Sequence, residues 1–293
     1  MSRFAYVNGR YVRHADAAIH IEDRGYQFAD GVYEVCEVMG GRLVDERLHM
    51  DRLERSLSEL RIAMPMNRAA LGAVLRETVR RNLVRDGMVY LQVSRGVAPR
   101  NHAFPDDDTA PALIVTAKSV ARASGDKRAE TGVAVISVPD NRWERVDIKT
   151  VSLLPNVLAK QAAKEAGAYE AWFVDKDGNV TEGSSTNAWI VTTDGALVTR
   201  PASGGILKGI TRTVIFELAA ATGLRIEERA FSLDEAKSAR EAFITAATTL
   251  VMPVVRIDAE AIGNGAPGSI ATALRQRFHD FAEVAPLWSR GGA

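Results

Sequence analysis

The sequence R-W-E-R-V-D-I-K at residues 142–149 leads into a segment with helical periodicity, residues 153–167. Val146 and Ile148 alternate with polar residues, which predicts a short strand that ends at Lys149. A lysine at a strand end that is partly shielded from water can serve as a Schiff-base nucleophile. The alternative is an ordinary strand-end lysine, and these residues alone leave both interpretations open.

The overall composition is typical of a globular protein. The 293 residues are 46% hydrophobic and 25% charged, which suffices for two domains or one large one. The 37 basic and 37 acidic residues give a formal net charge of zero, so we expect no nucleic-acid or membrane partner. The single cysteine, Cys36, excludes an internal disulfide, and no apolar run reaches the roughly 18 residues of a membrane span. We therefore expect a cytoplasmic protein.

Residues 1–120 are predicted to form a small α/β domain. Asn8 and Gly9 separate two alternating runs, which is the pattern of a β-hairpin. A second alternating pair surrounds residues 40–41, and a stripe of leucines then predicts a helix over residues 45–62. Residues 121–130 are polar and contain no large apolar side chain, so we assign them to an interdomain linker.

Residues 131–286 are predicted to form a larger second domain that again mixes strands and helices. Its clearest helices are predicted over residues 154–166, 208–222 and 269–282. Strands are predicted at residues 133–138, 171–174, 188–191, 241–245 and 253–257. Residues 287–293 are predicted to be a disordered tail.

Two clusters contain a charged residue with an open role. In T-E-G-S-S-T-N at residues 181–187, Glu182 is either a surface carboxylate or a buried acid that holds a cationic group. In H-M-D-R-L, Arg52 is either an exposed helix arginine or a charge-assisted partner for a phosphate.

Two further clusters lie in loops. Residues 204–211 lead into a predicted helix whose free N–H groups suit a phosphate, although glycine before a helix is common. Residues 245–249 are interpreted as a second turn that enters a helix, and their role is equally ambiguous. Arg100 and His102 lie between two prolines and are either solvated or suited to a carboxylate. His102 has no second ligand at metal-binding spacing, so no metal is expected.

Taken together, these motifs resemble those of the fold type IV pyridoxal phosphate enzymes, and among them the bacterial D-amino acid transaminases. The resemblance runs from about residue 6 to residue 281. It rests on E-D-R-G-Y-Q-F-A-D-G-V-Y-E at 22–34, P-R-N-H at 99–102, R-W-E-R-V-D-I-K at 142–149, L-A-K-Q at 158–161, T-E-G-S-S-T-N at 181–187 and I-L-K-G-I-T-R at 206–212. It implies an α/β (α+β) fold with a small N-terminal α/β domain and a larger C-terminal pseudo-barrel domain.

The same resemblance implies a role for each matching residue. Lys149 would form the Schiff base with pyridoxal 5'-phosphate and move the substrate proton, while Glu182 would pair with the pyridine nitrogen. The remaining cofactor contacts would come from Arg52, Leu207, Ile210, Thr211, Ala247 and Thr248. Ala246 and Ala247 replace hydroxyl residues that are frequent near the phosphate in these transaminases, so that contact would fall to the backbone or to Thr248.

The substrate side of the resemblance implies a homodimer with a shared active site. Tyr33, Arg100 and His102 correspond to the carboxylate trap of the D-amino acid enzymes, in which the neighbouring subunit supplies the arginine and histidine. Ala29 replaces a glycine of the usual motif close to Tyr33, which would narrow the pocket.

The implied reaction is ping-pong transamination between D-amino acids and 2-oxo acids, with D-alanine and 2-oxoglutarate giving pyruvate and D-glutamate. Three related enzymes remain as alternatives: a branched-chain L-amino acid aminotransferase, an (R)-amine transaminase and an aminodeoxychorismate lyase. A noncatalytic cofactor-binding protein is the alternative without enzyme activity.

Overall fold

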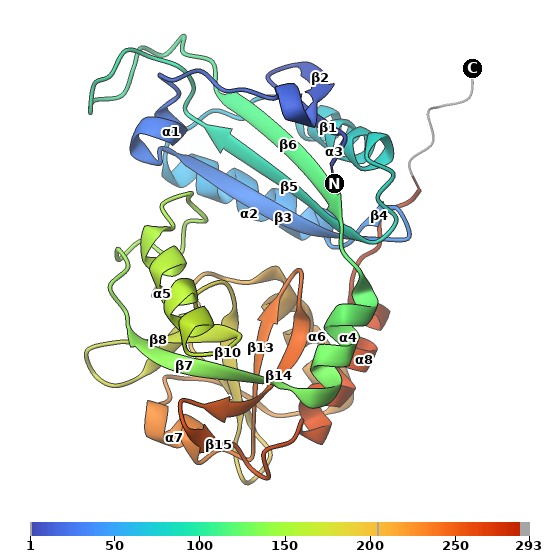
Figure 1. The fold of residues 1–293 in the computed structure, drawn as a ribbon, viewed down its shortest axis with the longest axis vertical. Coiled ribbons are helices and arrows are strands. Elements are labelled where there is room, and N and C mark those ends of the chain that lie inside the picture. Colours follow the sequence, from blue (N-terminus) through green and yellow to red (C-terminus); the bar gives the residue numbers. More distant parts are fainter. Residues whose placement is uncertain (1, 204, 288–293) are drawn as a thin grey trace. The chain divides into compact units, whose positions relative to one another are not determined.

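Figure 1 shows the fold of a computed structural model that describes residues 2–203 and 205–287. The described chain divides into two compact units. We call residues up to 122, together with 148–152 and 283–287, the N-terminal unit, and residues 123–147 and 153–282 the C-terminal unit. The short segment that contains Lys149 therefore belongs to the N-terminal unit, although the sequence prediction placed it in the second domain.

The N-terminal unit is built on a six-stranded sheet with the order β2-β1-β6-β5-β3-β4. All of its neighbouring strands are antiparallel, as expected for a sheet that begins with hairpins. The predicted first turn is confirmed, because Asn8 and Gly9 have φ values of 43° and 93° between β1 and β2. The strands are β1 (Phe4–Val7), β2 (Arg10–Arg13), β3 (Gly31–Met39), β4 (Arg42–Leu43), β5 (Gly87–Ser94) and β6 (Ala112–Ser119).

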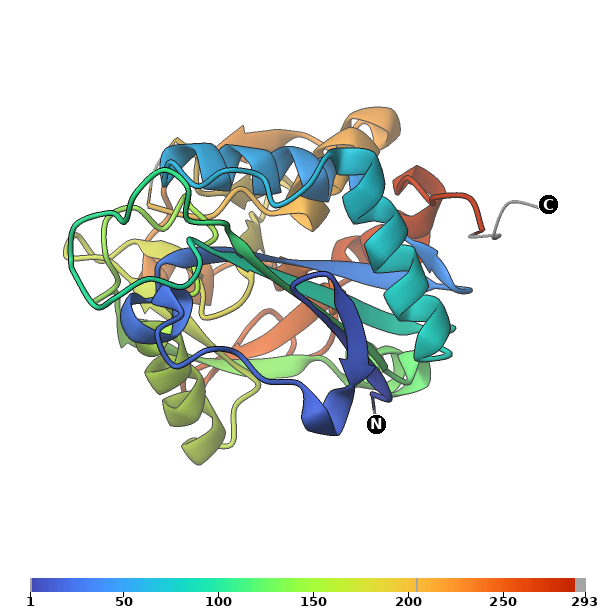
Figure 2. The same ribbon diagram turned by 90° about the horizontal axis from the view of Figure 1, so that it is seen from above.

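Two long helices pack against this sheet (Figure 2). Helix α2 (Glu46–Glu59) contacts β3, and α3 (Arg68–Arg81) contacts β1, β5 and β6. The predicted leucine stripe is confirmed, since Leu53 and Leu57 are buried. Asn67 caps α3 by accepting a hydrogen bond from Ala70 N at 2.9 Å. The unit also contains the short helices η1 (His14–Asp16) and α1 (Arg24–Phe28).

The C-terminal unit is built on a nine-stranded mixed sheet with the order β12-β11-β10-β13-β14-β7-β8-β9, and β15 pairs with β14. Its end strand β9 also contacts β10, so this sheet curls into the pseudo-barrel that the resemblance implied. The strands are β7 (Val133–Pro139), β8 (Glu170–Val174), β9 (Val180–Gly183), β10 (Asn187–Val191), β11 (Leu197–Thr199), β12 (Ile226–Glu228), β13 (Glu241–Ala246), β14 (Leu250–Ile257) and β15 (Glu260–Ala261).

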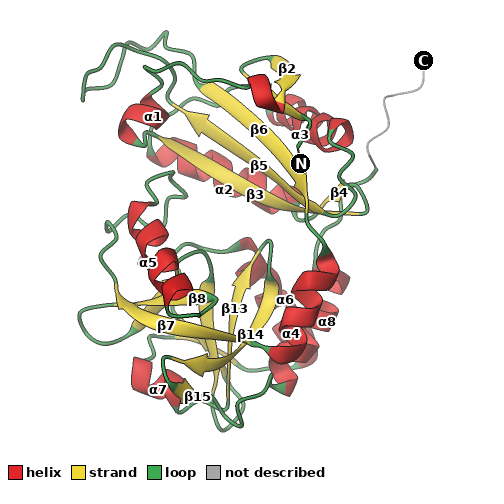
Figure 3. Ribbon diagram, in the orientation of Figure 1, coloured by secondary structure: helices red, strands yellow, loops and turns green. Residues whose placement is uncertain are grey.

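Helices pack against the inner strands of this sheet (Figure 3). Helix α5 contacts β7 and β8, whereas α6 and α8 contact each other and β13. The C-terminal unit contains α4 (Arg122–Thr131), α5 (Leu154–Glu165), α6 (Ile210–Thr222), α7 (Leu233–Lys237) and α8 (Ser269–Phe281).

Three sequence expectations differ from the structure. Residues 121–130, expected to be a linker, lie largely in α4, because Ala, Arg, Lys and Glu favour a helix even without an apolar stripe. Lys149 does not end a strand but lies in an irregular segment beside β3, with Thr150 bridged to Val32. Residues 245–249 do not enter a helix but form the turn of the β13–β14 hairpin. Gly204 and all but the first residue of the predicted tail lie outside the described residues.

Candidate active site

Lys149 lies beside the start of β3 in the N-terminal unit. Its carbonyl oxygen accepts a hydrogen bond from Tyr33 N at 3.0 Å, and its backbone N–H donates to Ser56 Oγ at 3.4 Å. Its Nζ lies 4.1 Å from the centre of the Tyr33 ring. A lysine amine over an aromatic face is positioned by that ring, and this contact fixes where the Lys149 side chain points.

A buried cluster of charged side chains surrounds Glu34, the residue that follows Tyr33 on β3. Glu34 accepts hydrogen bonds from Arg52 Nε at 2.7 Å and Nη2 at 2.8 Å, and its Oε2 lies 2.7 Å from His49 Nδ1. Although burial opposes it, the Arg52 guanidinium and the His49 ring hold the pKa of Glu34 well below its usual value. Burial lowers the pKa of His49, so its ring is neutral at pH 7. Arg52 is thereby fixed in one orientation by a bidentate pair.

The loop with Arg100 and His102 is exposed and both side chains contact the same ring. The Arg100 guanidinium carbon lies 4.5 Å from the centre of the Phe28 ring, and the His102 ring lies 5.3 Å from it. Buried Arg24 fixes the loop between them by donating to Asn101 O at 2.6 Å.

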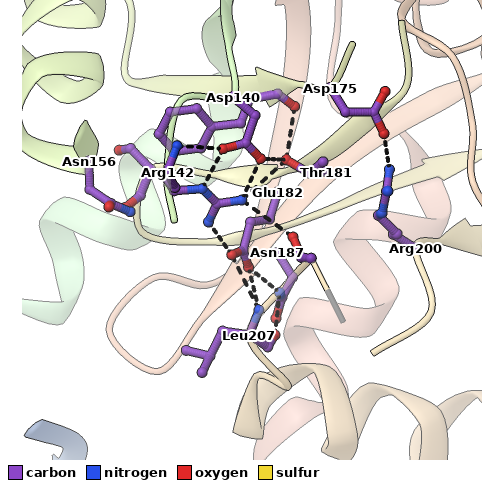
Figure 4. Close-up of polar contacts among 12 residues, drawn as sticks. Asp140, Arg142, Asn156, Asp175, Thr181, Glu182, Asn187, Arg200 and Leu207 are labelled. Carbon is purple, nitrogen blue, oxygen red and sulfur yellow. Dashed lines mark hydrogen bonds and ion pairs between the residues drawn. The ribbon is translucent and has the colours of Figure 1, made fainter. Parts of the chain in front are cut away.

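A second polar cluster surrounds Glu182 on β9 in the C-terminal unit (Figure 4). Arg142 Nη1 forms a short ion pair with Glu182 Oε1, and Asn187 Nδ2 donates to Oε2 at 3.0 Å. The backbone N–H of Leu207 donates to both oxygens, at 3.2 and 3.1 Å. Burial raises the pKa of Glu182 even though Arg142 opposes the shift.

The start of α6 adjoins this cluster along the chain. Gly209 occupies the N-cap position, where it has no side chain to cap the first turn, and Thr211 is buried. The N–H groups of Ile210 and Thr211 therefore belong to the part of a helix that favours an anion. Ala247 and Thr248 lie in the β13–β14 turn of the same unit, half-buried and exposed respectively.

The family model described as amino-transferase class IV matches residues 31–257, which is most of the chain. The chain belongs to the class IV aminotransferases.

Curated relatives of this aminotransferase match it over nearly its whole length. A D-alanine aminotransferase of Bacillus licheniformis is 43% identical over 92% of this chain and 94% of the relative. One from Listeria monocytogenes serotype 4b is 40% identical over 93% of both chains. One from Staphylococcus haemolyticus is 37% identical over 95% of this chain and 97% of the relative.

Solved structures confirm the fold of this aminotransferase. The branched-chain amino acid aminotransferase of Escherichia coli matches with a TM-score of 0.88 at 23% identity, over 96% of this chain and 94% of that chain. A hypothetical aminotransferase from Mycobacterium tuberculosis in its PLP-bound form matches with a TM-score of 0.81 at 23% identity, over 94% of this chain and 97% of that chain. Identities this low show the fold type alone.

The sequence prediction missed five polar residues of the aminotransferase that contact predicted site residues or the partners of those residues. In the N-terminal unit, Glu34 binds Arg52, and His49 binds Glu34. In the C-terminal unit, Arg142 and Asn187 bind Glu182, and Asp140 binds Arg142. Four of them already stood in the quoted sequences, Glu34 and Asn187 as the last residue of a motif and Arg142 and His49 as the first. Asp140 stood outside every quoted motif and carried no signal that separates a site residue from an ordinary polar one.

The described residues of the aminotransferase contain no group of three or more His, Cys, Asp or Glu that could hold a metal ion. None of the helices in residues 2–203 and 205–287 is long and apolar enough to cross a membrane.

Proposed function

We propose that this aminotransferase transfers the amino group of a D-amino acid to a 2-oxo acid, with D-alanine and 2-oxoglutarate giving pyruvate and D-glutamate. The observation that carries the proposal is that relatives 37–43% identical over more than nine-tenths of the chain are D-alanine aminotransferases. The exposed Arg100 and His102 beside Phe28 support it, because an arginine fork and an imidazole suit a substrate carboxylate.

The proposed cofactor is pyridoxal 5'-phosphate, and the surroundings of Glu182 fit its ring nitrogen. A carboxylate can accept about four hydrogen bonds. Arg142, Asn187 and Leu207 supply three donors, so Glu182 retains capacity for the N–H of a protonated pyridine. When bound, this cofactor supplies an aldehyde that takes up an amino group and a ring that stores the electron pair left at Cα.

We assign the covalent link and the proton transfer to Lys149. Its Nζ would take the proton from substrate Cα and return it to the cofactor carbon, which is general acid–base catalysis by one amine. The Tyr33 ring, 4.1 Å from Nζ, would support the ammonium form of the lysine while it carries that proton.

We assign phosphate binding to Arg52 and to the first turn of α6. Glu34 holds two nitrogens of the Arg52 guanidinium in a buried pair, which fixes the direction in which the side chain points. Ile210 and Thr211 would add N–H groups and a hydroxyl, with Leu207 against the ring. Ala247 would contribute only backbone, and Thr248 a hydroxyl from the neighbouring turn.

We further propose a homodimer in which the Arg100 and His102 loop serves the partner's site. Helix α5 supports an interface, because Leu154, Val157 and Leu158 are 68, 58 and 59% exposed at helical spacing. A cytoplasmic location is part of the same proposal, in line with the free, buried Cys36.

A spectral titration of the purified enzyme tests the reaction. With D-alanine, the absorbance band of the bound cofactor should convert to that of its aminated form, and 2-oxoglutarate should restore it. L-Leucine, L-alanine and (R)-1-phenylethylamine should leave the band unchanged. Conversion by L-leucine would identify a branched-chain enzyme, and pyruvate release without an amino acceptor would identify a lyase.

The Arg100→Ala variant distinguishes the proposed D-amino acid transaminase from an (R)-amine transaminase in the same assay. Loss of one charge-assisted hydrogen bond to the substrate carboxylate, about 1.5–3 kcal/mol, should lower kcat/KM for D-alanine about tenfold to a hundredfold. The exposed Arg85→Ala is the matched control. Unchanged kcat/KM in Arg100→Ala would exclude the carboxylate trap.

A further inference from the structure

Asp140 lies behind Arg142 on the side away from Glu182 (Figure 4). It follows β7 directly and accepts from Arg142 Nε at 2.9 Å and Nη2 at 2.8 Å. Thr181, the neighbour of Glu182 on β9, donates its hydroxyl to Asp140 at 2.7 Å. The side chains of Asp140, Arg142 and Glu182 are 14, 5 and 7% exposed, so water screens their charges little.

The charges of Asp140, Arg142 and Glu182 do not cancel. Arg142 alone would neutralise Glu182 and leave no net charge beside the position assigned to the pyridine nitrogen. With Asp140 ionised, the three side chains together carry one negative charge. A buried positive charge is stabilised by a nearby negative one, and a neutral environment would instead favour loss of its proton.

We propose that Asp140 is a positioning residue that offsets the charge of Arg142, so that Glu182 keeps the cofactor's pyridine nitrogen protonated. The inference rests on the proposed function, because it concerns the same cofactor. Arg142 then has a steric role, since its guanidinium holds the Glu182 carboxylate and packs 4.4 Å from the centre of the Phe173 ring. Asp140 permits this contact without loss of the negative charge.

The ionisation states agree with this division of roles. Burial opposes it, but hydrogen bonds from Arg142 and Thr181 hold the pKa of Asp140 below its usual value, so Asp140 is charged at neutral pH. Glu182 responds oppositely: burial raises its pKa, Arg142 lowers it and Asp140 raises it again. The remaining partners of Glu182 in the C-terminal unit, the Asn187 amide and the Leu207 N–H, are neutral.

The same unit provides a matched control pair. Asp175 accepts from Arg200 Nη1 at 2.7 Å, and the two side chains are 19 and 23% exposed. Figure 4 shows this pair apart from the Glu182 cluster, with no contact joining the two among the residues drawn. Asp175→Asn therefore removes a comparable ion-paired carboxylate without touching the partners of Glu182.

The test is a pH titration of the holoenzyme by 15N NMR, with the cofactor labelled at its ring nitrogen. In Asp140→Asn, the proton affinity of that nitrogen should fall about tenfold, which is a pKa lower by about one unit. The D-alanine half-reaction should slow about tenfold while the concentration for half-saturation changes less than about threefold. Asp175→Asn should match the wild type in both measurements.

The double variant Asp140→Asn/Arg142→Gln decides between a charge effect and a packing effect. It again leaves Glu182 as the one net negative charge, so it should recover most of the proton affinity lost in Asp140→Asn. A double variant as impaired as Asp140→Asn, or a single variant that titrates like Asp175→Asn, would overturn the inference. Those outcomes differ from failure of the proposed function, in which the wild-type enzyme itself would not convert with D-alanine.

Discussion

At the scale of single residues, both units use a buried carboxylate held by an arginine. Glu34 is wholly buried and bound by Arg52 and His49, and Glu182 is bound by Arg142. Removing one partner from such a pair leaves a buried charge uncompensated, which usually costs about 3–5 kcal/mol. These pairs therefore define side-chain orientation first, and their contribution to net stability is secondary.

His49 makes the stability of this enzyme depend on pH. Because burial lowers the pKa of His49 in the folded state, a falling pH protonates this histidine in the unfolded chain before it does so in the folded chain. The free energy of unfolding should therefore fall as the pH drops through the unfolded pKa of about 6.5. In His49→Gln an amide replaces the ring beside Glu34, and this loss of stability between pH 8 and pH 5 should become smaller.

Urea denaturation across this pH range measures the effect. The exposed His14→Gln is the control and should follow the wild-type curve. Glu34 contributes little, because its pKa lies below this range in both states: the unfolded value is 4.5, and in the folded state Arg52 and His49 lower it further against the effect of burial. Parallel curves for His49→Gln and the wild type would show that His49 is not the source of the pH dependence.

At the scale of elements, the start of α6 holds Glu182 through the backbone. A Cβ added to Gly209 would lie 2.1 Å from Asn187 Oδ1, so Asn187 would have to move. Asn187 donates to both Glu182 and Leu207 O, at 3.0 and 2.9 Å. Gly209 is therefore a glycine for reasons of space, because its φ of −65° is open to any residue.

Gly209→Ala should weaken cofactor binding. Loss of one hydrogen bond to a buried charged group costs about 1.5–3 kcal/mol, so the cofactor dissociation constant should rise about tenfold to a hundredfold. Equilibrium titration of the apoenzyme with pyridoxal 5'-phosphate measures it. Gly125→Ala in α4, where the nearest atom to an added Cβ is 3.6 Å away, should bind the cofactor normally. Equal binding by both variants would contradict the steric role of Gly209.

Local sequence patterns predicted the elements well where one physical signal dominates. The Asn8–Gly9 turn and the leucine stripe of α2 are examples, since turn chemistry and helical periodicity act over a few residues. The short strands β9 and β11 and helix α1 were missed because elements of only three to five residues are too short to show a period. Lys149 was misread as a strand end for a different reason: its backbone is bound by β3, more than a hundred residues earlier.

The candidate site was predictable only in part. Lys149 and Glu182 stood in motifs that a family resemblance could interpret, but the residues that orient them could not be recognised. Asp140 is one of many aspartates in the sequence, and its contact with Thr181 of β9, forty-one residues away, becomes visible only when the sheet is folded.

At the scale of the whole molecule, the exposed apolar stripe on α5 requires a partner if the proposed dimer is formed. Val157→Asp places a charge at the middle of that stripe and removes a burial of about 1.5–3 kcal/mol per subunit. The dimer dissociation constant should then rise by more than about tenfold. Light scattering coupled to gel filtration, over a dilution series, measures it.

The exposed polar residue Gln276 on α8 supplies the control for this prediction, because it lies on another helix. Gln276→Asp adds the same charge to the protein and should leave the dissociation constant unchanged. A Val157→Asp protein that stays dimeric at the same dilutions would place the interface elsewhere.

The placement of residues 148–152 in the N-terminal unit also bears on how the protein is made. The ribosome has to release about thirty more residues after the last strand of that unit's sheet before Lys149 emerges and can dock beside Gly31 and Tyr33. Until then the start of β3 has no neighbour on that side, and the Lys149 amine is absent from the nascent domain. Under the role proposed for Lys149, the nascent N-terminal unit cannot hold the cofactor covalently before this segment has been made.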